Sequence, residues 1–291
     1  MSLPDLLQGH PALAIALTFF FSLMIGSFLN VVIHRLPVMM QRDWEAQCAE
    51  LRGETRPPQP AFDLLRPASH CPHCQHRITP RENIPLLSYL WQKGRCRACG
   101  EKISLRYPVI ELGCAVLSAV VIWRLGATPQ GLAGVFLTWI LITLSAIDID
   151  HQLLPDSITL PVLWLGLLLN LFGVFTDATA SLVGAMAGYL SLWLIFHLFK
   201  LLTGKEGMGY GDFKLFALFG AWLGWQALPQ IILLSSLVGA TAGIAMIAFL
   251  GRDRQLPIPF GPYLAAAGWI ALLWGDDITR AYLAWASPAS F

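Results

Sequence analysis

Two short acidic motifs hold the residues whose types and spacing could do chemistry. One is Asp-Ile-Asp-His at positions 148–151, and the other is Gly-Tyr-Gly-Asp at positions 209–212. Each lies at the end of an apolar stretch, where a carboxylate is costly unless it is paired, hydrated or protonated. Two carboxylates held close together share one proton, so one can activate a water molecule while the other hydrogen-bonds a carbonyl oxygen. The motifs therefore predict an intramembrane aspartyl protease with Asp148 and Asp212 as its catalytic pair.

The glycines of the second motif predict a substrate-binding edge. Gly209 and Gly211 have no Cβ, so an extended peptide backbone could approach Asp212 closely. A substrate helix must unwind before its carbonyl group can be attacked, and strand-like pairing would hold the unwound segment. We therefore expect Gly209, Tyr210 and Gly211 to bind substrate.

A simpler alternative is that these acidic residues only cap helices or balance the lysines of the 200–214 segment. A single Asp at the end of an apolar stretch would favour this alternative, whereas Asp148 combined with a glycine-rich acidic motif favours catalysis. Asp150 would face away from Asp148 if the helix continues through both residues. Asp156 follows Pro155 and is predicted to be the N-cap of the next helix.

The elements that must position these motifs are apolar helices. The chain of 291 residues is 56% hydrophobic and only 13% charged, against about 25% charged residues in soluble domains. Long apolar runs recur, close to the roughly 20 residues that cross a bilayer as a helix. We predict an all-α polytopic membrane protein with about eight transmembrane helices, at residues 11–33, 108–125, 131–147, 158–175, 181–200, 213–228, 230–250 and 261–275. The net charge of +1 gives no sign of nucleic-acid binding.

The distribution of basic residues predicts the orientation in the membrane. Residues 34–106 hold 12 of the 19 Lys and Arg residues and form an insertion between the first two spans. With eight spans, 17 basic residues lie on the side of this insertion, including Arg252 and Arg254. Only Arg124 and Arg280 lie on the other side. Because basic residues accumulate on the cytoplasmic side, we expect the insertion and both acidic motifs to face the cytoplasm and both termini to face the periplasm.

The insertion carries two Cys-x-x-Cys pairs. Cys71 and Cys74 form the first pair, and Cys96 and Cys99 form the second. Four thiolates arranged in two such pairs complete a closed tetrahedral zinc site, and a cytoplasmic location argues against stable disulfides. A reduced apolar core or a redox pair are the alternatives. We predict a structural zinc ion and three parts: a first helix at 1–33, a zinc-binding insertion at 34–107 and a seven-helix protease core at 108–291.

Several motifs together resemble the type IV prepilin peptidases. They are Gly-Ser-Phe-Leu-Asn at 26–30 with His-Arg-Leu-Pro at 34–37, the two cysteine pairs, Arg-Tyr-Pro at 106–108 leading to Glu111, both acidic motifs, and Pro-Ile-Pro-Phe-Gly-Pro at 257–262. Their order along the chain matches that family. The catalytic residues of the family map onto Asp148 and Asp212.

The resemblance implies a bifunctional enzyme of the bacterial inner membrane. Such an enzyme would remove the short basic leader of prepilins and secretion pseudopilins at a bond between Gly and Phe, and would then methylate the new N-terminus. The methyl donor would be S-adenosylmethionine, although no Gly-x-Gly-x-x-Gly nucleotide-binding unit is present. The insertion and the adjoining ends of the first two spans are the expected location of methyl transfer, with Glu111 as a candidate participant.

Three other functions compete with this interpretation. Presenilin-like proteases pair a Tyr-Asp motif with Gly-x-Gly-Asp, but here Ile147 precedes Asp148 and the cysteine pairs are additional. A cation transporter would need polar residues nearer the middle of the membrane. A thiol oxidoreductase would use the Cys-x-x-Cys pairs, yet the doubled pair and the cytoplasmic placement favour a metal.

Overall fold

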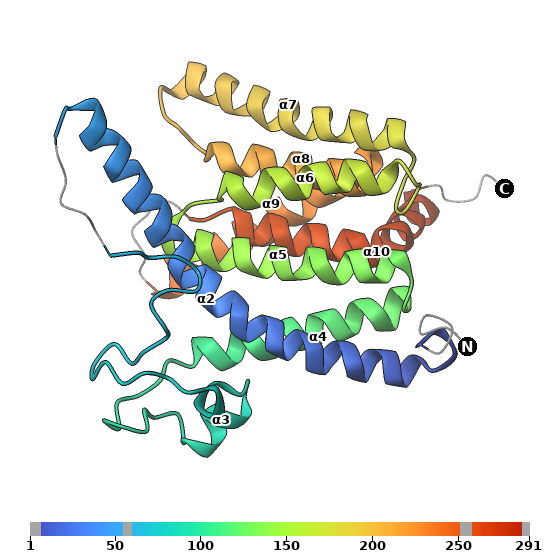
Figure 1. Cartoon of the computed structure of the whole chain (residues 1–291). Coiled ribbons are helices and arrows are strands. Elements are labelled where there is room, and N and C mark those ends of the chain that lie inside the picture. Colours follow the sequence, from blue (N-terminus) through green and yellow to red (C-terminus); the bar gives the residue numbers. More distant parts are fainter. Residues whose placement is uncertain (1–6, 55–59, 251–257, 287–291) are drawn as a thin grey trace. The chain divides into compact units, whose positions relative to one another are not determined.

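The computed structural model describes residues 7–54, 60–250 and 258–286 and contains two compact units. Unit 1 comprises Met1–Ala127 and unit 2 comprises Thr128–Phe291. The described residues are largely helical and contain no β-strand, only two isolated β-bridges in the insertion (Figure 1). The predicted all-α polytopic membrane fold is therefore confirmed. Arg252, Arg254 and Pro257, which entered the sequence argument, lie outside the described residues.

Unit 1 is built on two long helices, α2 (Pro11–Leu51) and α4 (Arg106–Leu125). They pack closely because Gly26 leaves no room for a side chain: a Cβ there would lie 2.8 Å from Cα of Glu111. The side-chain amide of Asn30 strengthens the contact by donating hydrogen bonds to the carbonyl oxygens of Gly26 and Tyr107, each at 3.2 Å. The segment between the two helices contains the 3-10 turn η1 (Pro80–Asn83) and the short helix α3 (Leu87–Trp91).

Helix α2 continues well beyond the predicted end of the first span. It has 41 residues, about 60 Å in length and roughly twice the hydrocarbon thickness. The scattered charges and the prolines of residues 41–68 predict an irregular loop, and this prediction is wrong for residues 41–51. Their charges lie on a largely exposed helix surface, and Gln, Arg, Glu, Ala and Leu in this stretch are good helix formers. Pro37 is accommodated inside the helix without ending it.

The described residues of unit 2 form a bundle of six helices. They are α5 (Pro129–His151), α6 (Asp156–Asn170), α7 (Ala178–Thr203), α8 (Tyr210–Leu223), α9 (Leu228–Leu250) and α10 (Gly261–Ala286), with the 3-10 turn η2 (Trp225–Ala227) before α9. Among the described residues, five helices are long and apolar enough to cross a membrane, namely α2, α4, α5, α7 and the helical region Trp225–Met246. Each of the eight predicted spans coincides with a helix. The sixth, at 213–228, is interrupted, because Gly224 ends α8 with a positive φ of 81°.

Helix α8 is the centre of unit 2 and is almost entirely buried. Its 14 residues span about 21 Å, less than the roughly 30 Å of hydrocarbon, and α6, α7 and α10 pack around it (Figure 1). Against α7 the contact is between backbones: Gly220 of α8 lies on Gly184, and a Cβ at Gly188 would lie 2.8 Å from the carbonyl oxygen of Phe216. This close seam holds α8 against its neighbour.

The C-terminal end of α8 is fastened by buried polar side chains. Asn170, only 1% exposed, donates hydrogen bonds to the carbonyl oxygens of Ala221 (2.8 Å) and Trp222 (2.9 Å). The hydroxyl group of Ser181 also donates to the Ala221 carbonyl oxygen, and the indole of Trp222 donates to the carbonyl oxygen of Val162 at 2.8 Å. The last carbonyl groups of a helix lack partners within the helix, so these contacts satisfy them and fix the axial position of α8.

Candidate active site

Asp148 lies in the last turn of α5 and is 5% exposed. The helix ends three residues later, at His151, because Gln152 adopts a left-handed conformation (φ 52°) and its amide donates to the carbonyl oxygen of Asp148. The carboxylate oxygen Oδ2 of Asp148 accepts a hydrogen bond of 3.0 Å from the backbone amide of Gly261, the first residue of α10. A residue 113 positions away therefore orients this carboxylate.

Asp212 lies in the first turn of α8 and is 7% exposed. Gly209 is the N-cap, and its carbonyl oxygen accepts a hydrogen bond of 3.2 Å from the amide of Asp212. The positive end of the helix dipole favours an acidic side chain at this position. Asp212 is thus positioned by the start of α8, and the other end of α8 is held by the hydrogen bonds from Asn170 and Ser181.

The two aspartates lie in the same part of unit 2, near enough for the charge of Asp148 to act on Asp212. Leu154 lies beside a neighbour of each: a Cβ at Gly211 would be 2.8 Å from its Cβ, and a Cβ at Gly261, whose amide binds Asp148, would be 3.3 Å from its Cδ2. The arrangement is two buried carboxyl groups against an apolar wall, which suits general acid–base chemistry on one water molecule.

The glycine motif has two different surroundings. Leu154 fills the space beside Gly211, whereas a Cβ at Gly209 would meet only Oδ2 of Asp212, at 3.6 Å. The ring of Tyr210 is half-exposed and packs against Phe196 and Phe213, with centroid separations of 5.2 and 5.5 Å. Open space next to Asp212 therefore lies on the side of Gly209, and the side of Gly211 is closed by packing.

The remaining acidic residues of this region have other roles. Asp150 is exposed. The prediction of Asp156 as an N-cap is wrong: Pro155 is the N-cap, and Asp156 begins α6 and pairs with Lys214 at 2.6 Å. Sequence reasoning missed this pair, since Lys214 was read only as a nearby positive charge. It also missed the Gly261 amide, although the motif at 257–262 pointed to that region.

The four predicted metal-binding cysteines form one cluster in unit 1. Their sulfur atoms lie within 4.8 Å of one another, with 3.8 Å between Cys71 and Cys99 and 3.9 Å between Cys74 and Cys96. These separations are too long for disulfides, and all four thiols are free. A regular tetrahedron of sulfur atoms with metal bonds of about 2.3 Å has edges of about 3.8 Å. The cluster therefore has the dimensions of a zinc site.

Two matching turns present the cysteines. In each turn the residue after the second cysteine has positive φ, 59° at Gln75 and 75° at Gly100, and its amide donates to the carbonyl oxygen of the first cysteine. The backbone amides of Cys74 and His73 point at the Cys71 sulfur and lower the pKa of that thiol to about 7. Such turns favour the thiolate form that binds metal.

The sulfur atoms also oppose one another's ionisation. At Cys99 the Glu101 amide favours the thiolate, but desolvation and the three neighbouring thiols outweigh it and raise the pKa to about 12. A divalent cation would remove this conflict, because it neutralises the charge of crowded thiolates.

Glu82 supports the base of the first turn. The amide and then the hydroxyl group of Thr79 donate to its carboxylate, at 2.9 and 2.8 Å, and hold the pKa of Glu82 down to about 2. His76 lies 3.3 Å from the same carboxylate. Because the folded-state pKa is lowered, this carboxylate stabilises the insertion above its ordinary pKa of about 4.3 and loses that effect as the pH falls towards 2.

Glu111 lies on α4 and lines a cavity of about 510 Å³ within unit 1. It is 8% exposed, and its Oε2 accepts a hydrogen bond of 2.9 Å from the amide of Leu86. The walls of the cavity come from one face of α2, one face of α4 and the two cysteine turns. Glu111 therefore joins the insertion to α4 and borders this cavity.

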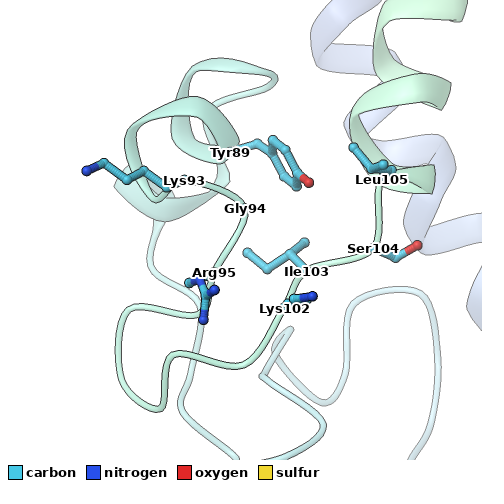
Figure 2. Close-up of a pocket in the computed structure, with 8 residues that line it drawn as sticks. All are labelled: Tyr89, Lys93, Gly94, Arg95, Lys102, Ile103, Ser104 and Leu105. Atoms are coloured by element: carbon cyan, nitrogen blue, oxygen red, sulfur yellow. The ribbon is translucent and has the colours of Figure 1, made fainter.

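A second hollow, of about 470 Å³, adjoins the turn before Cys96 (Figure 2). Lys93, Arg95 and Lys102 line it together with Tyr89 and the start of α4. Gly94 is required here: its φ is 67°, and a Cβ would lie 2.7 Å from the hydroxyl oxygen of Tyr89. Tyr89 lines both the hollow and the cavity, so the segment around the second cysteine pair contributes to the walls of each.

Comparison with known proteins identifies the family. Residues 20–125 match the bacterial peptidase A24 N-terminal domain, and residues 135–244 match the type IV leader peptidase family. A prepilin leader peptidase/N-methyltransferase of Aeromonas hydrophila is 58% identical over 96% of this chain and 97% of its own length. The chain belongs to the type IV leader peptidase family. It is therefore an enzyme, as the sequence motifs predicted, and a multi-pass protein of the inner membrane.

Other relatives extend the same pattern. Proteins of the same name from Pseudomonas aeruginosa and Dichelobacter nodosus are 56% and 48% identical to this chain. The matches cover 98% and 97% of this chain and 99% and 98% of the relatives. No solved structure matches the chain. The two matched family regions fall in units 1 and 2, respectively, with the cysteine cluster and Glu111 in the first and both aspartates in the second.

Proposed function

We propose that the chain cleaves the leader peptide of prepilins and related pseudopilins at a bond between Gly and Phe, using Asp148 and Asp212. The observation that carries this proposal is that two buried carboxyl groups, at the end of α5 and the start of α8, lie in the same part of unit 2 near Leu154. The ionised carboxylate takes a proton from water, and the resulting hydroxide attacks the scissile carbonyl carbon. The protonated partner donates to the carbonyl oxygen, and a proton then passes to the leaving amine as the bond breaks.

The substrate is held near Gly209 and Tyr210 in this proposal. Gly209 leaves space beside the Asp212 carboxylate, and the exposed edge of Tyr210 offers an aromatic surface to an apolar side chain. Gly211, also predicted to bind substrate, would act through its backbone because Leu154 occupies the space next to it. An apolar substrate helix can enter from the bilayer while its basic leader stays at the surface.

The orientation follows from the basic residues. With the insertion and both aspartates on the cytoplasmic side and both termini in the periplasm, the leader would be cut at the cytoplasmic face. The proposed division has a first helix at 1–33, a zinc-binding insertion at 34–107 and a protease core at 108–291, whereas the contacts alone divide the chain after Ala127.

The insertion binds a structural zinc ion in this proposal. Cys71, Cys74, Cys96 and Cys99 supply four thiolates at tetrahedral spacing, so the ion has no open position for catalysis. Its contribution is the folding of a segment too small to form a large apolar core.

The second activity is methylation of the new N-terminus. S-adenosylmethionine, when bound, supplies an electrophilic methyl group. The cavity of about 510 Å³ beside Glu111 is large enough for a ligand of this size, and it offers aromatic, amide and carboxylate side chains. Unit 1 would bind and orient the reactants, separately from the peptidase carboxylates of unit 2.

The test is leader cleavage by variants of the two aspartates. Asp148→Asn and Asp212→Asn should each lower cleavage of a prepilin with a Gly–Phe junction by more than 1,000-fold, while the exposed control Asp150→Asn retains it. Mass measurement separates loss of the leader from addition of a methyl group. Normal cleavage by either variant of the pair would refute the mechanism, and methylation of a pre-cut substrate should persist in both.

A further inference from the structure

The inference concerns the cavity of unit 1 and the charge of Glu111. One face of α2 contributes Ser27, Asn30 and His34 to the cavity wall, and one face of α4 contributes Tyr107 and Glu111. On α2 these positions are spaced by three and four residues, which places them in one row along the helix. The polar end of the cavity is thus formed where the two helices pack.

Glu111 has hydrogen-bond donors but no cation. The Leu86 amide donates to Oε2 and the Ser27 hydroxyl group is a second partner. Within the described part of the chain, no Lys, Arg or His forms an ion pair with this carboxylate. A buried carboxylate without a counter-charge is costly. A cation supplied by a ligand would remove that cost.

The nearby polar groups are arranged around the same space. The amide nitrogen of Asn30 is used by the carbonyl groups of Gly26 and Tyr107, and its oxygen Oδ1 accepts no hydrogen bond from the described residues. Arg35 also lines the cavity, but its guanidinium donates to the carbonyl oxygens of Asp63 (2.9 Å) and Pro67 (2.7 Å). Two oxygen acceptors therefore remain for a cationic ligand with N–H groups.

The position of Glu111 along α4 suits contact with the N-terminal end of an apolar substrate helix. It lies five residues beyond Arg106, the first residue of α4, or about 7.5 Å along the helix axis. A cleaved pilin begins with an apolar helix whose first residue carries a free α-amino group. This amino group has an ordinary pKa of about 8, so at neutral pH it is mostly a cation.

We propose that Glu111 and Asn30 bind the α-ammonium group of the newly formed N-terminus, and that Glu111 accepts the proton it must lose before methylation. This inference rests on the proposed methyltransferase function. The neutral amine attacks the methyl carbon of the donor; a nitrogen–carbon bond forms, the carbon–sulfur bond breaks, and sulfur keeps the electron pair. The proton held by Glu111 then returns to solvent, so that charge and atoms balance.

Binding of peptides to the full-length protein in lipid nanodiscs tests the amine site without any variant. The probes are a pre-cut peptide that begins with Phe and the same peptide acetylated at its N-terminus. Wild type should bind the free amine at least tenfold more tightly than the acetylated form at pH 7. Equal affinity would overturn the inference.

Glu111→Gln tests the residue itself. The amide oxygen can still accept the hydrogen bond from Leu86, so the packing is kept while the charge is lost. The tenfold preference for the free amine should disappear, the affinity for S-adenosylmethionine should stay within about twofold, and methylation at pH 7 should fall about 100-fold. The rate should recover up to about tenfold by pH 9, where most of the amine is already neutral in solution; a purely structural defect would not respond in this way.

Controls separate this inference from the proposed function. Glu50→Gln changes an exposed residue of α2 outside the cavity and should behave as wild type. If Glu111→Gln weakens donor binding but keeps the preference for the free amine, the carboxylate serves the donor and the inference is wrong. If wild type prefers the free amine yet never methylates it, the amine site stands and the proposed methyltransferase function fails.

Discussion

Replacement of Gly261 by Ala should disable the peptidase without removing a carboxylate. A Cβ at this position would lie 2.6 Å from Oδ2 of Asp148, whereas ordinary contacts begin at 3.4 Å, so the carboxylate must move by about 0.8 Å. Leu154 stands 3.3 Å from the same Cβ and limits relief on that side. A misplacement of about 1 Å can cost 100-fold in rate. We therefore expect kcat for leader cleavage to fall about 100-fold.

The assay compares cleavage and methylation in the same preparation. Methylation of a pre-cut substrate should stay unchanged, because the reactive groups proposed for it belong to unit 1. Gly275→Ala is the matched control on the same helix: its Cβ would lie at ordinary distances, 3.5 Å from Oε1 of Gln230 and 3.9 Å from Cβ of Ala271. Cleavage by Gly261→Ala within threefold of wild type would refute the role of the Gly261 amide in positioning Asp148.

Three further predictions test other parts of the structure. Cys71→Ser should lose the bound zinc measured by elemental analysis and lower the melting temperature, whereas Cys48→Ser should keep the metal; unchanged zinc in Cys71→Ser would contradict the four-cysteine site. Asn170→Ala should destabilise unit 2 by about 3 kcal/mol, since it leaves buried carbonyl and amide groups without hydrogen-bond partners. An unchanged thermal melt would show that Asn170 does not hold the end of α8. Asp156→Asn breaks the partly exposed ion pair with Lys214 and should lower the free energy of unfolding by less than about 1 kcal/mol. A larger decrease in the same melt would mean that the pair stabilises the fold more than an ordinary surface ion pair.

Local patterns in the sequence predicted most helices and the cysteine cluster. Apolar runs of span length mark helices directly, and two Cys-x-x-Cys pairs can satisfy one ion only if they meet. The count of spans between Asp148 and Asp212 predicts that both lie on one side of the membrane, and this stays a prediction. Their immediate partners did not follow, because the Gly261 amide is 113 residues from Asp148 and no local pattern encodes that contact.

Two errors have the same physical origin. Residues 41–51 were expected to be irregular because of their charges, but they continue α2, and a largely exposed helix can carry charge on all sides. Asp156 was expected to be a cap because Asp often begins a helix, yet its partner is a lysine 58 residues away. In both cases a local preference gave way to the surroundings supplied by the fold.

The hydrogen bonds from Asn170 and Ser181 to the C-terminal end of α8 allow a region distant from Asp212 to influence catalysis. Asp212 lies at the start of a short helix, and the other end of that helix is held in place about 20 Å away. Loss of those hydrogen bonds would let Asp212 move without changing its chemistry. Cleavage would then be sensitive to inhibitors or mutations that touch only the Asn170 end of α8.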